Sequence, residues 1–212
     1  MSSRNDRLMQ IVKTSPVIPV ITIERAEDAV PLAQALLKGG IATIEIALRT
    51  PAAVDAARAV IAAVPKMSVG IGTVLTPQNL ADAKAMGARY ALSPGATPEL
   101  LEAAAKGDFP YIPGIATASD VMAAVTRGFS VLKFFPAENA GGIAALRALA
   151  GPFPSARFCP TGGVNEKNFR TWLAEPNVVA VGGSWLAPAA DIAAGRWDAI
   201  TARAKAVTAP TA

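Results

Sequence analysis

The stretch VIPVITIERAEDAVPLAQALLKGGIATIEIA, residues 17–47, contains two short apolar runs separated by an alanine-rich segment. The runs Val17–Thr22 and Thr43–Ala47 have the length and the β-branched composition of strands. Between them, one helical face is apolar and comprises Ala29, Leu32, Ala33 and Leu36. Gly39 follows where a helix would end. Strand, helix and strand in this order predict a parallel βαβ unit.

The same alternation continues along the whole chain. Threonine followed by proline predicts three helix starts, because the hydroxyl caps a free N–H and proline has none to waste. These pairs are Thr50-Pro51, Thr76-Pro77 and Thr97-Pro98. Eight strands are expected in all, at Val17–Thr22, Thr43–Ala47, Ser68–Ile71, Tyr90–Leu92, Tyr111–Ile112, Val131–Phe134, Arg157–Cys159 and Val178–Val181.

Eight strands with helical crossovers predict an α/β protein, a (β/α)8 TIM barrel that forms a single domain over residues 1–212. An extra N-terminal helix is expected at residues 4–14, across the bottom of the barrel, and residues 208–212 are expected to be frayed. The alternative is an open doubly wound sheet. It is disfavoured because Thr22-Ile-Glu-Arg25 stands where a dinucleotide-binding sheet carries its glycine-rich turn.

Composition excludes several classes of protein. No apolar run reaches the roughly 18–20 residues that span a bilayer, and the first seven residues lack the apolar segment of a secretory signal. The one cysteine, Cys159, rules out an internal disulfide framework and fits a reducing cytosol, so a cytoplasmic protein without a membrane partner is expected. Cys159 is expected to be a buried core thiol.

The formal net charge is +4, but the cations are scattered and rarely adjoin aromatic residues. This pattern argues against nucleic-acid binding and favours attraction of small anions. The chain contains no histidine, which removes the commonest general base and the commonest metal ligand. We therefore expect no metal site, with an all-carboxylate Mg²⁺ site as the alternative. Catalysis is otherwise expected to use Lys, Glu, Asp, Tyr, Arg or backbone groups.

Active sites in such barrels lie at the C-terminal ends of the strands, where the unusual residues of this chain collect. Lys133 lies within the apolar run Val131–Phe134. Burial disfavours a charged ammonium and favours the free amine, the form that attacks ketones. The alternative is a lysine on the outward face that extends to solvent, which is harder where helices cover that face.

Glu45 is the second charged residue in an apolar strand. Alternation places Thr43, Glu45 and Ala47 on one face and the large aliphatic side chains on the other, so Glu45 is predicted to point inward. A buried carboxylate near a lysine can transfer protons during Schiff-base chemistry. A purely structural ion pair with Lys133 or Arg49 is the alternative.

Further candidates follow neighbouring strands. Arg49 and Thr73 are suited to binding a carboxylate, with a surface arginine and a strand-end cap as the alternatives. Glycines that end the last two strands, in Thr161-Gly162-Gly163 and Gly182-Gly183-Ser184, favour a phosphate site. Phe135, on the same side as Lys133, and Pro94, at the end of the fourth strand, are expected to line the pocket.

Several motifs together resemble the family of 2-keto-3-deoxy-6-phosphogluconate aldolase, also called 4-hydroxy-2-oxoglutarate aldolase, over nearly the whole chain. They are Glu45-Ile-Ala-Leu-Arg-Thr50, Gly72-Thr-Val-Leu75, Ser93-Pro-Gly95, Lys133-Phe-Phe-Pro-Ala-Glu138, Arg157-Phe-Cys-Pro-Thr-Gly-Gly163 and Gly182-Gly-Ser-Trp185. The resemblance implies a trimeric Schiff-base aldolase of the Entner–Doudoroff pathway, without metal or cofactor. Its partners would be a phosphorylated 2-keto acid substrate and two further copies of the chain in a homotrimer.

The resemblance also implies residue roles. Lys133 would be the Schiff-base lysine and Glu45 the general acid and base. Arg49 and Thr73, with Thr161 nearby, would bind the carboxylate of the pyruvyl part. The phosphate would be held by residues that end the last two strands, namely Gly162, Gly163 and Ser184, beside Gly183. The chain departs from the family at Ala47, where threonine is usual, and at Ala116, where serine is common.

Three other functions are compatible with the sequence. A sister family cleaves the phosphogalactonate epimer and tends to carry Leu-Asn-Ser where this chain has Leu48-Arg49-Thr50, so Arg49 favours the gluconate type. A phosphate-binding barrel isomerase would use the same glycines but gives no reason for Lys133. A trimeric scaffold, engineered or with a relic site, would need none of these side chains.

Overall fold

A computed structural model describes residues 3–209. Its strands are β1 (Val17–Ile21), β2 (Thr43–Ala47), β3 (Ser68–Gly72), β4 (Tyr90–Leu92), β5 (Tyr111–Ile112), β6 (Gly114–Ile115), β7 (Val131–Phe134), β8 (Arg157–Phe158) and β9 (Val181–Gly183). Its helices are α1 (Arg4–Val12), η1 (Ala26–Asp28), α2 (Ala29–Lys38), α3 (Ala53–Ala63), α4 (Pro77–Ala85), α5 (Pro98–Lys106), α6 (Ala118–Val125), α7 (Gly142–Ala150), α8 (Phe169–Leu173), α9 (Ala189–Ala193) and α10 (Trp197–Thr208).

The two ends of the predicted domain, residues 1–2 and 210–212, lie outside the described residues. The segment 208–212 was expected to be frayed. Its first residue, Thr208, instead ends α10, and its hydroxyl donates to the carbonyl of Gly39 over 3.0 Å. The remaining prediction for this segment falls largely on residues that are not described.

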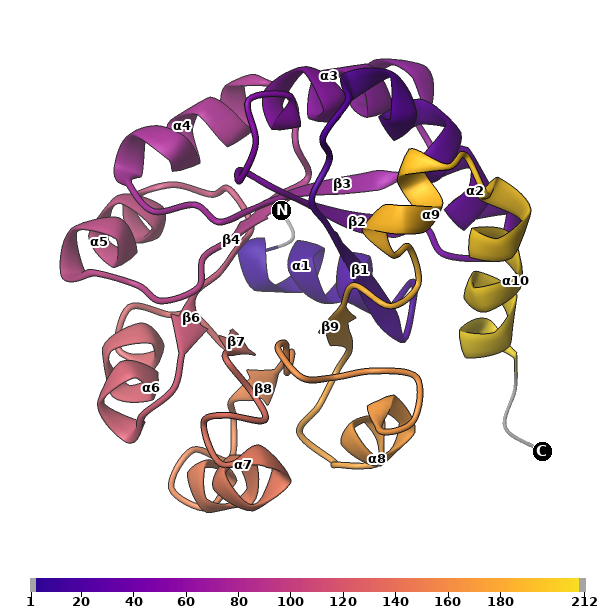
Figure 1. Cartoon of the computed structure of the whole chain (residues 1–212). Helices are drawn as coiled ribbons and strands as arrows, with labels where there is room; N and C mark the ends of the chain where they lie inside the picture. Colours follow the sequence, from indigo (N-terminus) through magenta and orange to yellow (C-terminus); the bar gives the residue numbers. More distant parts are fainter. Residues whose placement is uncertain (1–2, 210–212) are drawn as a thin grey trace.

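All strand pairs are parallel, as the βαβ pattern predicts. Six strands follow the order β5-β4-β3-β2-β1-β9, and three follow the order β6-β7-β8. The result is an α/β fold with a curled parallel sheet and helices on its outer face (Figure 1). Because the strands are parallel, their C-terminal ends meet on the same side of the molecule.

The fifth predicted strand, Tyr111–Ile112, is confirmed as β5, and a second short strand, β6, follows directly after Pro113. Strand β5 pairs with β4, and β6 pairs with β7. Proline has no N–H to continue a ladder, although its carbonyl still accepts from the N–H of Lys133 over 2.9 Å. The prediction of one short strand at Tyr111–Ile112 was therefore incomplete.

The eighth strand was predicted at Val178–Val181, but β9 is shifted along the chain to Val181–Gly183. Val178 belongs instead to the turn after α8, where its N–H donates to Glu175 over 3.0 Å, and it pairs with Phe158 only through an isolated bridge. A second isolated bridge joins Thr161 to Gly182. The predicted run, Val178–Val181, therefore covers the segment before β9 and only the first residue of β9.

Two of the three predicted threonine caps are confirmed. The hydroxyls of Thr76 and Thr97 accept from backbone N–H groups three residues ahead, at 3.1 and 3.3 Å. The third prediction was wrong, because α3 begins only at Ala53, and the Thr50 hydroxyl donates to the carbonyl of Ile23 instead. That bond ties the loop after β2 to the loop after β1, beside the strand ends.

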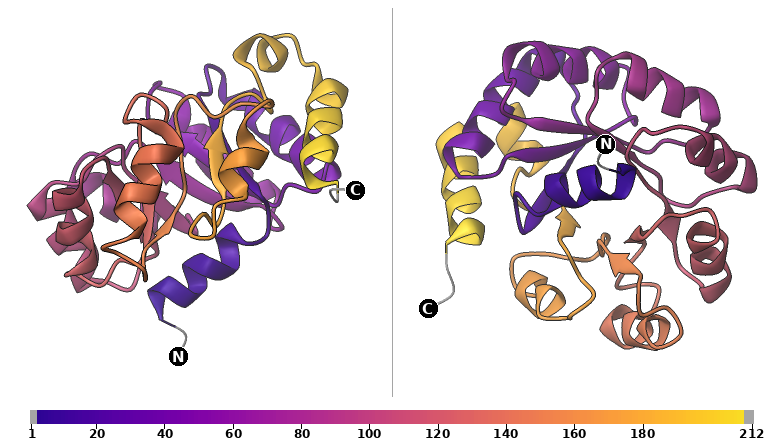
Figure 2. Two further views of the ribbon diagram at one scale, coloured as in Figure 1. Left: turned by 90° about the horizontal axis from the view of Figure 1, so that it is seen from below. Right: turned by 180° about the vertical axis from the view of Figure 1, so that it is seen from behind.

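The core has two parts. The larger lies between the strands and the outer helices, and it contains the predicted apolar face of α2. The smaller lies inside the curve of the sheet and includes Leu8 and Val12 of α1, which pack with Tyr90, Val131 and Cys159. Helix α1, predicted at residues 4–14, crosses the end of this interior (Figure 2). Across residues 3–209, no helix combines the length and the apolarity needed to cross a membrane.

Candidate functional site

Lys133 and Glu45 lie side by side inside the curled sheet, although 88 residues separate them in the sequence. The Lys133 Nζ donates to Glu45 Oε1 over 2.8 Å and to Oε2 over 3.1 Å. The two residues are only 3 % and 1 % exposed. Both charged residues therefore point inward, as their positions in apolar strands predicted.

The strand pattern explains this orientation. Ile44 and Ile46 of β2 pack in the outer core beneath the helices, so Glu45 between them must face the interior. In β7, Leu132 and Phe134 belong to the same outer core, which turns Lys133 inward. A buried pair of this kind suits proton transfer, although a structural ion pair would have the same contacts.

A second polar layer lies beneath the pair. The hydroxyls of Thr43 and Tyr90 are 2.8 Å apart, and burial raises the pKa of Tyr90 far above its usual value. Cys159 is buried in the same interior, where burial raises the pKa of its thiol to about 12. Both groups stay protonated near neutral pH, so Cys159 is the buried core thiol that was expected and is a poor nucleophile.

Gly72 provides the space in which the Glu45 carboxylate lies. A Cβ atom at this position would fall 2.1 Å from Glu45 Oε1 and 2.6 Å from Glu45 Cγ. The register aligns Gly72 with Ala47, two residues after Glu45 on the same face. Glycine at the end of β3 therefore sets the position of the carboxylate, a role that sequence reasoning missed.

We predict that Gly72→Ala displaces the Glu45 carboxylate and lowers turnover about 10-fold to 100-fold, because small misplacements of reacting groups are costly. Gly95→Ala is the matched control, since a Cβ there would meet nothing within 4 Å. Steady-state kinetics of both variants at equal folded fraction would test this prediction. Equal activity of the two variants would show that Gly72 does not position the carboxylate.

Arg49 and Thr73 meet at the mouth of the curled sheet. Arg49 Nε donates to Thr73 Oγ1 over 3.2 Å, and no acidic partner of Arg49 is found in the described part of the chain. Thr73 has a φ of 60°, in the left-handed region that residues other than glycine seldom adopt. Such strain is concentrated at functional sites. The arginine is therefore available to an anion from solvent.

A cavity of about 500 Å³ opens beside these residues. Most of the predicted binding residues line it: Arg49, Phe135, Thr161, Gly162, Gly163, Gly183 and Ser184. Its lining does not include Lys133, Glu45 or Thr73. Val20 does line it and is aligned with Glu45 in the register of β1 and β2, and the Phe135 ring centroid is 5.7 Å from Lys133 Nζ. The cavity thus extends to the level of the buried pair.

Backbone groups on one wall of this cavity are suited to binding an anion. Gly162 and Gly163 have φ values of 97° and 81°, which glycine adopts without strain. Within residues 3–209, the N–H groups of Gly163 and Ser184 have no protein acceptor. Free N–H groups that face a cavity are suited to binding phosphate oxygens.

Pro94 and Trp185 do not have the positions relative to this cavity that the sequence predicted for them. Pro94 does not line this cavity, and its carbonyl packs instead against Gly114, where a Cβ would fall 2.4 Å from the oxygen. Trp185 was interpreted as a packing residue, but it lines the cavity while its ring lies 5.8 Å from that of Phe169. Its position directly after Gly-Gly-Ser was the signal that could have identified it.

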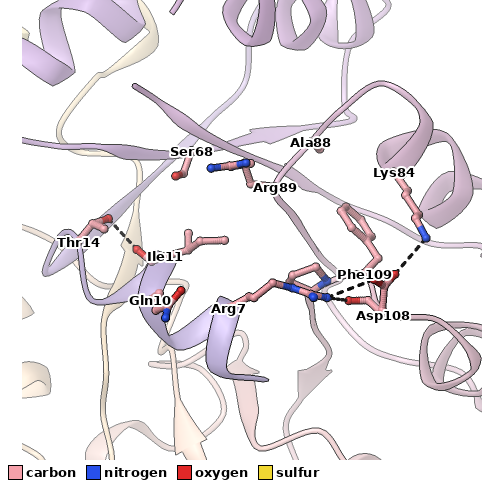
Figure 3. A pocket seen from close by; sticks show the side chains of 11 residues that line it. Arg7, Gln10, Ile11, Thr14, Ser68, Lys84, Ala88, Arg89, Asp108 and Phe109 are labelled. Carbon is pink, nitrogen blue, oxygen red and sulfur yellow. Dashed lines mark hydrogen bonds and ion pairs between the residues drawn. The ribbon is translucent and has the colours of Figure 1, made fainter. Parts of the chain in front are cut away.

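A second cavity, of about 490 Å³, lies at the opposite ends of the strands, between α1 and the starts of β3 and β4 (Figure 3). Its lysine, Lys84, donates to Asp108 over 3.1 Å, and Arg7 binds the same carboxylate. The Lys84 hydrogen bond lowers the pKa of Asp108. A solvated, paired lysine is a poor nucleophile, so the first cavity is the better candidate site.

The described residues include no group of three or more His, Cys, Asp or Glu that could hold a metal ion. The polar groups of the site are an amine, a carboxylate, a guanidinium, hydroxyls and backbone N–H groups. This set can form an imine, move protons and bind anions.

Comparison with known proteins identifies the family. Residues 8–203 match the family described as KDPG and KHG aldolase. The KHG/KDPG aldolase of Escherichia coli (strain K12) is 51 % identical over 195 residues, which is 92 % of each chain. Solved structures of KDPG aldolases are also similar to this chain.

The KDPG aldolase of Legionella pneumophila, with pyruvate captured as a covalent carbinolamine intermediate, superposes with a TM-score of 0.93 at 48 % identity, covering 95 % of this chain and 98 % of that chain. The aldolase of Zymomonas mobilis ZM4 with 3-phosphoglycerate gives a TM-score of 0.90 at 40 % identity, covering 98 % and 97 %. By the match of its residues 8–203 to the family model and by its 51 % identity to the Escherichia coli protein, this chain belongs to the KDPG and KHG aldolase family, and is thus a lyase.

Proposed function

We propose that the protein is a Schiff-base aldolase that cleaves 2-keto-3-deoxy-6-phosphogluconate to pyruvate and glyceraldehyde 3-phosphate. It also cleaves 4-hydroxy-2-oxoglutarate, which carries no phosphate, to pyruvate and glyoxylate. The observation that carries this proposal is the contact of Lys133 Nζ with both oxygens of Glu45, at 2.8 and 3.1 Å. The Legionella protein with its carbinolamine supports the same covalent chemistry.

Schiff-base formation begins with proton transfer inside the buried pair. A proton moves from Lys133 Nζ to Glu45, which leaves a free amine and a carboxylic acid. The amine attacks the C2 carbonyl carbon of the substrate, Glu45 protonates the resulting oxygen, and loss of water gives an iminium ion.

Cleavage then uses the iminium ion as the electron sink. Glu45 accepts the proton of the C4 hydroxyl, the C4 oxygen forms a carbonyl, and the C3–C4 bond breaks. Its electron pair gives an enamine bonded to Lys133 Nζ. The aldehyde leaves, C3 is protonated, and hydrolysis of the iminium ion releases pyruvate and regenerates the amine.

The rest of the cavity holds the anionic ends of the substrate. We assign the pyruvyl carboxylate to Arg49 and Thr73, which are 3.2 Å apart, with Thr161 nearby. The phosphate is assigned to Gly162, Gly163, Gly183 and Ser184, because two free N–H groups lie there. The 3-phosphoglycerate bound to the Zymomonas protein supports a site for a phosphorylated acid. Phe135 forms a wall beside Lys133.

We also propose a closed (β/α)8 barrel, in which β5 and β6 are two halves of one strand. The continuity of the chain at Pro113 and the two isolated bridges between the segments of β8 and β9 support closure. Helix α1 would then be the extra N-terminal helix at its bottom. The proposed working form is a cytoplasmic homotrimer in the Entner–Doudoroff pathway.

Borohydride reduction in the presence of pyruvate tests the proposed function. We expect a mass gain of one reduced pyruvyl group, located on Lys133 by peptide mapping, because borohydride fixes an imine as a stable amine. Protein treated with borohydride alone is the control. An unmodified chain, or a label on Lys84, would instead favour an isomerase or a scaffold.

We predict that activity survives EDTA, because the proposed chemistry needs only the amine and the carboxylate. The aldehyde produced is measured before and after dialysis against the chelator. Loss of activity that Mg²⁺ or Mn²⁺ restores would indicate a metal-dependent aldolase with carboxylate ligands.

A further inference from the structure

Glu138 ends the motif that begins at Lys133, yet no step of the proposed reaction uses it. Its side chain is largely exposed, but its contacts are specific. Glu138 Oε1 accepts from Asn168 Nδ2 over 3.0 Å and from Trp172 Nε1 over 3.1 Å. The ring of Trp172 is fully buried and packs against Phe134 of the lysine strand. A buried donor thus fixes the direction of this carboxylate.

The same residue holds the glycines that line the cavity. The Glu138 N–H donates to the Gly162 carbonyl over 3.0 Å. Its Cγ and Cβ lie where a Cβ of Gly163 would fall, at 2.4 and 2.6 Å. The side chain of Glu138 is therefore packed directly against the backbone of Gly163.

Asn168 completes the support from the other side. Its Nδ2 also donates to the Gly163 carbonyl over 3.1 Å, and Asn165 Nδ2 donates to the same oxygen over 3.0 Å. Glu138 orients Asn168. The Glu138 side chain therefore supports Gly163 both by packing against it and through the side-chain amide of Asn168. These amides fix the peptide that follows Gly163, while the bond from the Glu138 N–H to the Gly162 carbonyl fixes the peptide that carries the Gly163 N–H.

We propose that Glu138 is a positioning residue that makes the enzyme selective for phosphorylated substrates, which rests on the proposed function. By packing against Gly163 and holding the Gly162 carbonyl, it keeps the free Gly163 N–H directed at the phosphate. It touches neither the phosphate nor Lys133. Its loss should therefore weaken binding of the phosphate and leave the chemistry at Lys133 unchanged.

The experiment compares two substrates in each variant. 2-Keto-3-deoxy-6-phosphogluconate carries the phosphate, and 4-hydroxy-2-oxoglutarate does not. The quantity measured is the ratio of kcat/KM for the first substrate to kcat/KM for the second. For Glu138→Ala, we expect this ratio to fall about 10-fold, through KM, because charge-assisted hydrogen bonds to the phosphate are weakened.

Glu138→Gln is the matched control, because its amide oxygen can still accept from Trp172 and Asn168. We expect it to keep the ratio within about twofold of wild type, since an acceptor oxygen stays at the position of Oε1. Ser184→Ala, at the proposed phosphate site, should lower the ratio independently. If Glu138→Ala does not fold, Asn168→Ala removes the other support of Gly163 and is measured in its place.

Each outcome decides between the proposals. A normal ratio in Glu138→Ala with a lowered ratio in Ser184→Ala would overturn the positioning role and leave the proposed function intact. An equal loss on both substrates would show that Glu138 only stabilises the fold, and this also overturns the role. Normal ratios in both variants would reject the phosphate assignment itself, and a wild type that cleaves neither substrate would reject the proposed function and this inference with it.

Discussion

Lys133→Ala and Lys133→Arg are both expected to reduce cleavage below the limit of detection. Alanine removes the attacking amine, and the guanidinium of arginine stays protonated and cannot form the imine. The two variants complement each other, because arginine keeps a cation beside the buried Glu45 whereas alanine leaves that carboxylate unpaired. Single-turnover cleavage and circular dichroism of both variants would test this expectation.

Lys84→Ala provides the control for this test. Lys84 is a solvated lysine at the other end of the strands, paired with Asp108, and its loss should leave the rate unchanged. Cleavage at the wild-type rate by either folded variant of Lys133 would exclude a covalent mechanism at this position.

Glu45→Gln is expected to lower the rate of cleavage by roughly 10²–10⁴-fold, the usual contribution of a general acid or base. Glutamine keeps the shape and one acceptor oxygen but cannot take up a proton from Lys133 or from the C4 hydroxyl. Substrate affinity should change much less, because Arg49, Thr73 and the glycines would still hold both anionic ends. Rapid-quench kinetics give the rate of cleavage, and a separate binding measurement gives the Kd of the substrate.

The alternative role of Glu45 is structural, and it predicts a different result. Breaking a buried ion pair leaves an uncompensated charge that costs about 3–5 kcal/mol. In that case Glu45→Gln would lower the Tm strongly while the folded fraction turned over normally. Such a variant would leave Lys133 without a proton carrier, and another group would have to be found.

Alternation along β2 predicted the inward direction of Glu45, because it lies between residues that must face the helices. Lys133 was expected to point inward because helices cover the outward face of its strand. The parallel order of the strands predicted that the candidate residues share one end of the sheet. These predictions succeed because the alternation of side chains is a local property of a strand. The C-terminal ends of parallel strands always lie at the same edge of a sheet.

Other features depend on contacts between distant segments and were not predictable from one sequence. The Thr50 hydroxyl has a competing acceptor, the carbonyl of Ile23, that only the folded chain brings near. Gly72 looked like an ordinary strand end, and its closeness to Glu45 arises from the pairing of β2 with β3. Pro94 follows the fourth strand as expected, yet its carbonyl packs against Gly114 and it does not line the cavity.

Helix α1 closes the interior beneath Lys133 with the apolar side chains of Leu8 and Val12. Bulk water therefore reaches the buried pair from the cavity side, and a bound substrate occupies that same route. The proton that Glu45 takes from the C4 hydroxyl would then be shielded from solvent until the product leaves. The helix would thus help the enzyme to return that proton to C3 of its own product.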